Sequence, residues 1–258
     1  MNVQISSITP SFKYLFATLL TIGLVVVPIT SDQTVLQALL FIQILVFWKV
    51  RRINPEFGEI SFFLLAWACS KYFFPTYQIW PLTFLIPMIA TFAFALLTRA
   101  PLLNKLTLGR PDRASVKLAI LIGLVSIVAL YVWLQWFHPD LQIQQGLIPQ
   151  GSIFLLGVLL VGFALVNATM EEIIYRGWWF PIPAGRLEQW VMVSCQAIGF
   201  GAAHVIGGVP GGTAGFTMTF CYALMLGWLR LRSGGLLLPL CVHIVTDIYI
   251  GTILFSRN

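Results

Sequence analysis

Five ionisable side chains in apolar surroundings are the residues of this sequence that could do chemistry. Glu171 and Glu172 are adjacent in a long apolar stretch that has no turn signal. The other three, His204, His243 and Asp247, lie in apolar segments further along. A carboxylate at bilayer depth costs about 3 kcal/mol or more, so it faces a protein interior or a wet cavity. Carboxylates and imidazoles together therefore predict acid–base chemistry.

Glu172 and Arg176 are spaced for an ion pair. Residues four apart share one face of a helix, while adjacent residues point about 100° apart. We therefore expect Arg176 to hold Glu172 ionised and to leave Glu171 free to take a proton. The alternative places the two glutamates and Arg176 at a helix end in the headgroup region, with the Arg176 side chain extended toward the membrane surface. The following stretch, Gly177 to Pro181, has the aromatic residues of an interfacial belt.

Both histidines have a partner at the same helical spacing. His204 follows Phe200 by four residues, and with Glu171 it could take a proton from water. On its own, His204 is equally compatible with helix packing. His243 precedes Asp247 by four residues. The aspartate could fix the tautomer of His243, both could donate to an oxyanion, or the pair could be a polar clasp between helices.

The segments that carry these residues are typical of membrane helices. The chain has 258 residues, of which 59% are hydrophobic and 9% charged, whereas soluble domains have about 25% charged residues. The sequence predicts an all-α polytopic membrane protein of eight or nine transmembrane helices. The third span is short, carries Lys71 and ends before Pro75, which leaves the number open. The candidate spans are 14–30, 34–48, 60–74, 79–98, 117–137, 152–175, 190–206, 215–231 and 235–255.

Basic residues fall in alternate loops, which predicts a cytoplasmic N-terminus under the positive-inside rule. Loops 31–33, 75–78, 138–151 and 207–214 contain no lysine or arginine. This placement also argues against nucleic-acid binding, despite the net charge of +6. The basic residues of the loops expected in the cytoplasm are Lys13, Lys49, Arg51, Arg52, Arg99, Lys105, Arg110, Arg113, Arg176, Arg186, Arg230 and Arg232.

Ionisable residues divide the chain into two parts. Spans up to residue 137 have no acid or histidine in their interiors, so residues 1–140 are interpreted as scaffold helices and 150–255 as the catalytic core. The four cysteines have no metal-type spacing and are interpreted as free thiols. We expect no cofactor and no metal. The glycine-rich stretch 207–215 lacks a P-loop lysine and is expected to be a flexible connection beside His204.

Three ordered motifs resemble those of the CAAX-protease and bacteriocin-processing membrane proteins. They are the adjacent glutamates with an arginine four residues on, the phenylalanine and histidine pair, and the histidine and aspartate pair. The resemblance covers roughly residues 150–255. It implies an intramembrane endopeptidase of the glutamate type without an obligatory catalytic metal.

The resemblance also implies a role for each motif. Carried over to this sequence, Glu171 and His204 activate water, and His243 and Asp247 form the oxyanion site. Glu172, Arg176 and Phe200 are supporting residues. The eukaryotic prenyl-protein proteases of this family resemble one another in having asparagine where this chain has Asp247. An ionised carboxylate would repel an oxyanion, so Asp247 is either protonated there or serves to orient His243.

The sequence thus predicts an endopeptidase that cuts a membrane-associated or lipidated peptide. Its expected partners are that peptide and the bilayer. One alternative is a zinc peptidase with Glu171, His204 and His243 as ligands, although no HExxH motif is present. Another is a binding or immunity protein that captures a peptide without cutting it. A proton-coupled transporter is a third, but the chain lacks two related halves with broken helices.

Overall fold

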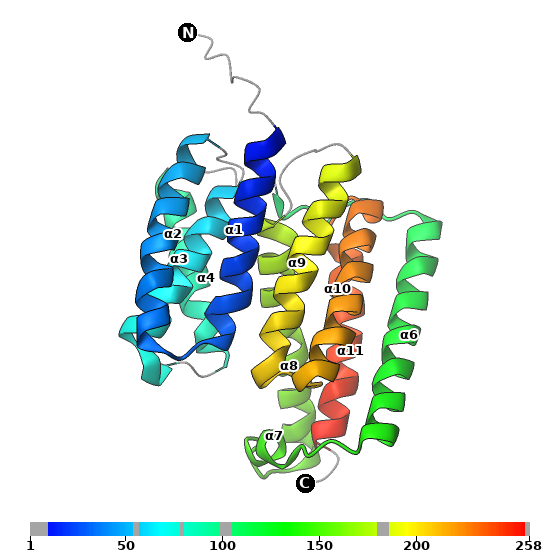
Figure 1. Ribbon diagram of the computed structural model, residues 1–258. Coiled ribbons are helices and arrows are strands. Elements are labelled where there is room, and N and C mark those ends of the chain that lie inside the picture. The colour runs from blue at the N-terminus through cyan, green and yellow to red at the C-terminus, as the bar shows by residue number, and fades with distance from the viewer. Residues whose placement is uncertain (1–9, 54–56, 78–79, 99–104, 180–185, 256–258) are drawn as a thin grey trace.

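Long helices that reverse direction from one to the next make up the described part of the chain (Figure 1). The computed structural model describes residues 10–53, 57–77, 80–98, 105–179 and 186–255, and no strand occurs among them. The first described helix begins at one end of the bundle, and the last described helix finishes at the other. The predicted all-α fold is therefore confirmed.

The N-terminal helices form one side of the bundle. They are α1 (Pro10–Ile29), α2 (Gln33–Ile53), α3 (Gly58–Phe73), the 3-10 helix η2 (Pro75–Tyr77) and α4 (Leu82–Thr98). α3 packs against α1, α2 and α4. Near the end of α3, Lys71 Nζ donates to the carbonyl oxygens of Val27, Pro28 and Thr30 at 2.8, 3.2 and 2.7 Å. Lys71 therefore satisfies carbonyls at the end of α1 that have no partner within their own helix.

The C-terminal helices form the other side. They are α6 (Arg113–Phe137), α7 (Gln142–Gly146), α8 (Ile153–Glu172), the π-helix η3 (Ile173–Trp178), α9 (Arg186–Gly207), α10 (Gly212–Ser233) and α11 (Leu237–Phe255). α11 packs against both α8 and α6, and α9 packs against both α10 and α1. Contact between α9 and α1 therefore joins the two sides of the bundle.

Each predicted span overlaps one of the long helices. Within the described residues, six helices meet the length and composition expected of a membrane span. The apolar stretches Tyr14–Ile29 of α1 and Leu82–Thr98 of α4 are shorter than those six, and α3 has 16 residues. The outward-facing side chains of the long helices include Trp136 and Phe154, which are large, apolar and exposed. The chain is thus an integral membrane protein, and the number of eight or nine crossings stays a prediction.

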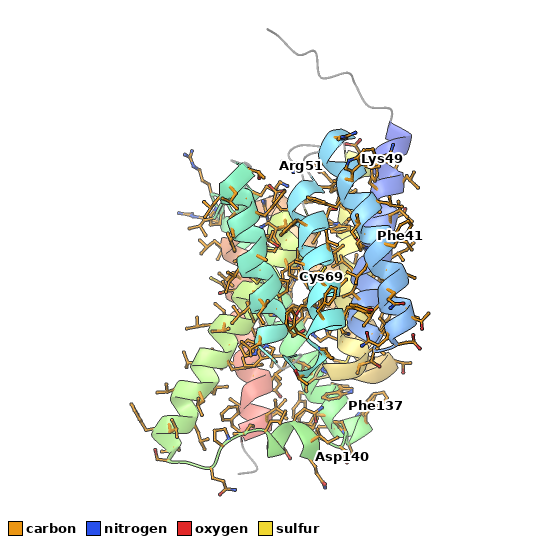
Figure 2. All side chains as sticks on the ribbon, turned by 90° about the vertical axis from the view of Figure 1, so that its left-hand side faces the viewer. Phe41, Lys49, Arg51, Cys69, Phe137 and Asp140 are labelled. Atoms are coloured by element: carbon orange, nitrogen blue, oxygen red, sulfur yellow. The ribbon has the colours of Figure 1, made fainter. Side chains whose placement is uncertain are left out.

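The helix directions place the basic loops at one end of the bundle and the loops without lysine or arginine at the other. Figure 2 shows Lys49 and Arg51 near one end, and Phe137 and Asp140 near the opposite end. This arrangement agrees with the predicted alternation of basic loops. Some residues of that prediction lie outside the description. They are Arg99 and the side chains of Lys13 and Arg186. Phe180 and Pro181, from the predicted interfacial belt, also lie outside the described residues.

The sidedness of the two ends is open to a labelling experiment. In a variant without the native cysteines, we expect single cysteines at Arg51 and Arg110 to react with an impermeant thiol reagent from the cytoplasmic side. A cysteine at Gln142 should react from the opposite side only. A cysteine at Leu124, which is exposed in the middle of α6, is the control and should react from neither. Labelling of positions 51 and 142 from the same side would overturn the topology.

Candidate active site

Glu171, Glu172 and Arg176 lie where α8 passes into the π-helix η3. The Ser152 hydroxyl caps the start of α8 by accepting from the Leu155 backbone N–H at 3.3 Å, and the α-helix continues as far as Glu172. The next turn is wider, as in the π-turns often found at functional sites. The predicted span of 152–175 contains the helix, but its apolar pattern gives no sign of the change in winding.

The predicted ion pair between Glu172 and Arg176 is present and buried. Arg176 Nη1 donates to Glu172 Oε1 at 2.9 Å, and the guanidinium lies over the Phe200 ring, 4.7 Å from its centroid. Arg176 has no solvent-exposed surface. It therefore does not extend to the surface of the protein, as the headgroup alternative would require. A carboxylate and an aromatic face together surround its charge.

His243 is held by Glu172, a partner on another helix. Its Nδ1 lies 2.8 Å from Glu172 Oε1. The same carboxylate oxygen therefore accepts from Arg176 and contacts His243. Because a carboxylate oxygen only accepts, Nδ1 carries the proton of this bond. The sequence offered Asp247 as the residue that fixes the tautomer of His243, and the structure places Glu172 in that position.

The other nitrogen of His243 faces the two remaining acids. Nε2 lies 3.4 Å from Glu171 Oε2 and 3.7 Å from Asp247 Oδ1. Both distances exceed those of well-formed hydrogen bonds. Glu171 is 7% exposed, and its Oε2 makes no hydrogen bond with the described residues. The carboxylate of Glu171 is thus buried, close to an imidazole and uncommitted.

Asp247 is connected to two residues that the sequence analysis missed. Its Oδ2 accepts from Asn167 Nδ2 at 3.1 Å, and Asn167 Oδ1 accepts from Trp80 Nε1 at 3.0 Å. Asn167 precedes Glu171 by four residues on an apolar helix, so helical spacing could have identified it. Trp80 precedes α4 in the other half of the chain, and no sequence pattern links it to the site.

His204 adjoins the cluster through Phe200. Its Nδ1 lies 2.8 Å from the Phe200 carbonyl oxygen, and the two rings are 4.6 Å apart. The Phe200 ring is in turn 5.9 Å from the His243 ring. Among the described residues, His204 makes no hydrogen bond or ion pair to Glu171. The structure therefore places His243, rather than His204, directly beside Glu171.

Aromatic side chains enclose the cluster. Tyr222 packs edge-on to His243 with a ring separation of 5.6 Å, and its hydroxyl bonds Thr246 Oγ1 at 3.2 Å. Tyr175 packs against Phe200 at 5.0 Å. All three rings are buried. These rings leave the polar groups in surroundings of low polarity.

The connection after His204 is packed, in contrast to the flexible loop expected from its glycines. Only residues 208–211 separate α9 from α10. A Cβ added at Gly208 would lie 2.7 Å from His204 Cβ, and one added at Gly215 would meet the Pro210 carbonyl oxygen. Glycine is therefore needed at both positions because backbone and side chains approach closely there.

The described residues contain no group of three or more His, Cys, Asp or Glu side chains that could hold a metal ion. Glu171, His204 and His243, the ligands of the zinc alternative, do not form such a group. The cysteines are free: Cys69 and Cys195 are half-buried, and Cys221 and Cys241 are exposed.

The helices that carry the site match a known family. Residues 152–249 match the family model described as "Rce1-like: Type II CAAX prenyl endopeptidase Rce1-like". The matched residues span α8, η3, α9, α10 and the first part of α11. The match confirms the resemblance to the CAAX-protease group. No curated protein and no solved structure matches the chain.

The Rce1-like segment contains all seven residues that the sequence analysis selected, and Trp80 lies outside it. Together with the apolar helices, the match supports a membrane-bound protease. The roles of the individual residues have to be argued from the chemistry of the site.

Proposed function

We propose that the chain is an intramembrane endopeptidase that hydrolyses a peptide bond of a membrane-associated, prenylated protein. One observation carries the proposal. Oε2 of the buried Glu171 carboxylate accepts no hydrogen bond from the described residues and lies 3.4 Å from His243 Nε2. A general base needs such an uncommitted carboxylate within reach of the proton that it abstracts. The Rce1-like match supports the substrate class.

Glu171 is the proposed general base, and His204 assists it. Glu171 takes a proton from water while the water oxygen forms a bond to the carbonyl carbon of the peptide. The Phe200 carbonyl oxygen can only accept, so neutral His204 carries its proton on Nδ1. Its Nε2 is then an acceptor that orients the same water. Glu171 finally passes the proton to the leaving amine as the C–N bond breaks.

His243 and Asp247 are proposed to face the oxygen that becomes negative. As water attacks, the electrons of the carbonyl double bond move to that oxygen, and preorganised donors stabilise it. Nδ1–H of His243 is committed to Glu172, so Nε2 donates when the ring is doubly protonated. Arg176 holds Glu172 in place. Glu172 and Arg176 therefore act on the reaction through the position of His243.

The proposal predicts cleavage that does not depend on a metal. Purified protein should cleave a fluorogenic prenylated peptide that ends in a C-a-a-X sequence, and a strong chelator should leave the rate unchanged. The Glu171→Gln variant is the inactive control. Loss of activity with chelator and recovery with zinc would make Glu171, His204 and His243 candidate ligands. Wild-type protein that binds the peptide without cutting it would instead be a binding protein.

A further inference from the structure

A chain of hydrogen bonds runs from the N-terminal helices to the proposed oxyanion site. Trp80, just before α4, donates to Asn167 on α8, and Asn167 donates to Asp247 on α11. The Trp80 ring also packs on Phe163 of α8 at 5.3 Å. Three separate elements thus converge on one carboxylate that is 3% exposed.

The chemistry of the indole determines which groups donate and which accept in this series of hydrogen bonds. A side-chain amide can be turned either way, so a partner of known type must determine its orientation. The Trp80 N–H can only donate. It therefore holds the Asn167 carbonyl oxygen, and the Asn167 amide hydrogens must point to Asp247. Oδ2 of Asp247 is then an acceptor in this bond.

This direction distinguishes the two oxygens of Asp247. The carbonyl oxygen of a protonated carboxyl group is a better acceptor than its hydroxyl oxygen, so the N–H that Asn167 donates favours an unprotonated Oδ2. A protonated Asp247 therefore carries its proton on Oδ1, which is the oxygen 3.7 Å from His243 Nε2. Oδ1–H is a donor on the side of the carboxyl group that faces the other ionisable residues of the cluster.

We infer that Asn167, held by Trp80, is a positioning residue that makes Oδ1 of Asp247 the donor to the developing oxyanion. The inference rests on the proposed peptidase function. It accounts for an aspartate where the resemblance implies an asparagine. The fixed amide of Asn167 orients a protonated carboxyl group so that it presents a donor, as a correctly turned asparagine would.

The first test replaces the aspartate alone. In Asp247→Asn, the amide of Asn167 still requires an acceptor, so the new side chain turns its oxygen toward Asn167 and its NH₂ toward His243. Cleavage of the fluorogenic prenylated peptide should persist with kcat lowered several-fold and KM unchanged, because an amide donor replaces the carboxyl donor that faces the oxyanion. An inactive but folded Asp247→Asn protein would overturn the inference, since the reaction would then require the carboxylate.

The decisive test exchanges the two groups. The double variant Asn167→Asp/Asp247→Asn again has one amide and one carboxylate, so the bond between positions 167 and 247 can form. The carboxylate at position 167 then accepts from Trp80 and from the new amide, which turns the amide oxygen toward His243. Thermal stability should equal that of wild type, while kcat should be about 10²-fold lower with KM unchanged, as for a lost oxyanion donor. Wild-type kcat together with wild-type stability would show a merely structural bond and overturn the inference.

A third variant tests the role of the indole. Trp80→Phe keeps a ring against Phe163 but removes the N–H, so the Asn167 amide is free to turn. We expect kcat to fall several-fold with KM unchanged. The matched control is Trp136→Phe on the exposed face of α6, which should behave as wild type. Equal activity of both variants would contradict a role for Trp80.

The experiments distinguish a failure of the proposed peptidase function from a failure of the positioning role of Asn167. If wild-type protein and Asp247→Asn both fail to cleave the peptide, the proposed function is wrong. If wild type cleaves it and the exchanged double variant is fully active, the function stands and the positioning role of Asn167 is wrong.

Discussion

Replacement of Glu171 by glutamine is expected to abolish peptide cleavage and to leave peptide binding intact. Glutamine keeps the size of the side chain and removes its basicity. General bases typically contribute about 10²–10⁴-fold to a rate, so the loss should be of this size and confined to kcat. The measurement is single-turnover cleavage of the fluorogenic prenylated peptide, with its binding followed separately. Glu188→Gln, in the first turn of α9, is the matched control and should retain activity.

A double variant tests whether Glu171 and His204 act as one unit. His204→Ala should cause a loss similar to that of Glu171→Gln, and the combined variant should lose little more. Residues that serve the same step are strongly non-additive in this way. Because no hydrogen bond or ion pair joins His204 and Glu171 among the described residues, this result depends on a shared water. Fully additive losses would separate the two residues and remove His204 from the proton transfer.

Replacement of Arg176 by alanine is expected to destabilise the protein by about 3–5 kcal/mol, the usual cost of leaving one partner of a buried ion pair alone. The side chains of Arg176 and Glu172 are 0% and 2% exposed, so water cannot substitute for the lost partner. The substitution also removes the guanidinium from the Phe200 ring. The measurement is the free energy of unfolding in detergent, taken from titration with denaturing surfactant.

Two controls accompany Arg176→Ala. Arg232→Ala breaks a pair with Asp112 that is 3.7 Å long, with side chains 49% and 60% exposed. It should change stability little, since solvent and salt screen exposed pairs. Glu171→Gln should also leave stability close to wild type. If Glu171→Gln were as destabilising as Arg176→Ala, Glu171 would be a structural residue and the proposed base would be lost.

The features that could be predicted from the sequence are local ones. Helix lengths follow from apolar runs because a bilayer requires backbone hydrogen bonds within each segment. The Glu172–Arg176 pair follows from helical spacing, and so does the placement of His243 and Asp247 on one face of α11. In each case the two partners lie within one turn of the same helix.

The contacts between helices could not be predicted, because a hydropathy pattern contains no register between one helix and another. Glu172 and His243 are 71 positions apart, and Trp80 and Asn167 are 87 apart. The π-turn after Glu172 is also invisible in the sequence, since it changes winding without changing composition. Helical spacing therefore points to Asp247, a neighbour in the same helix, as one possible partner of His243, whereas the structure places Glu172 beside its Nδ1.

The ion pair between Glu172 and Arg176 also bears on how α8 enters the bilayer during synthesis. Both partners belong to one continuous helical segment, so the pair can form as soon as that segment winds. His243 is synthesised 71 residues later than Glu172. Each separate charge at the bilayer centre costs about 3 kcal/mol on insertion. Because the two partners lie in one segment, two of the three charges of α8 and η3 can enter the bilayer as a neutral pair before α11, which carries His243, is synthesised.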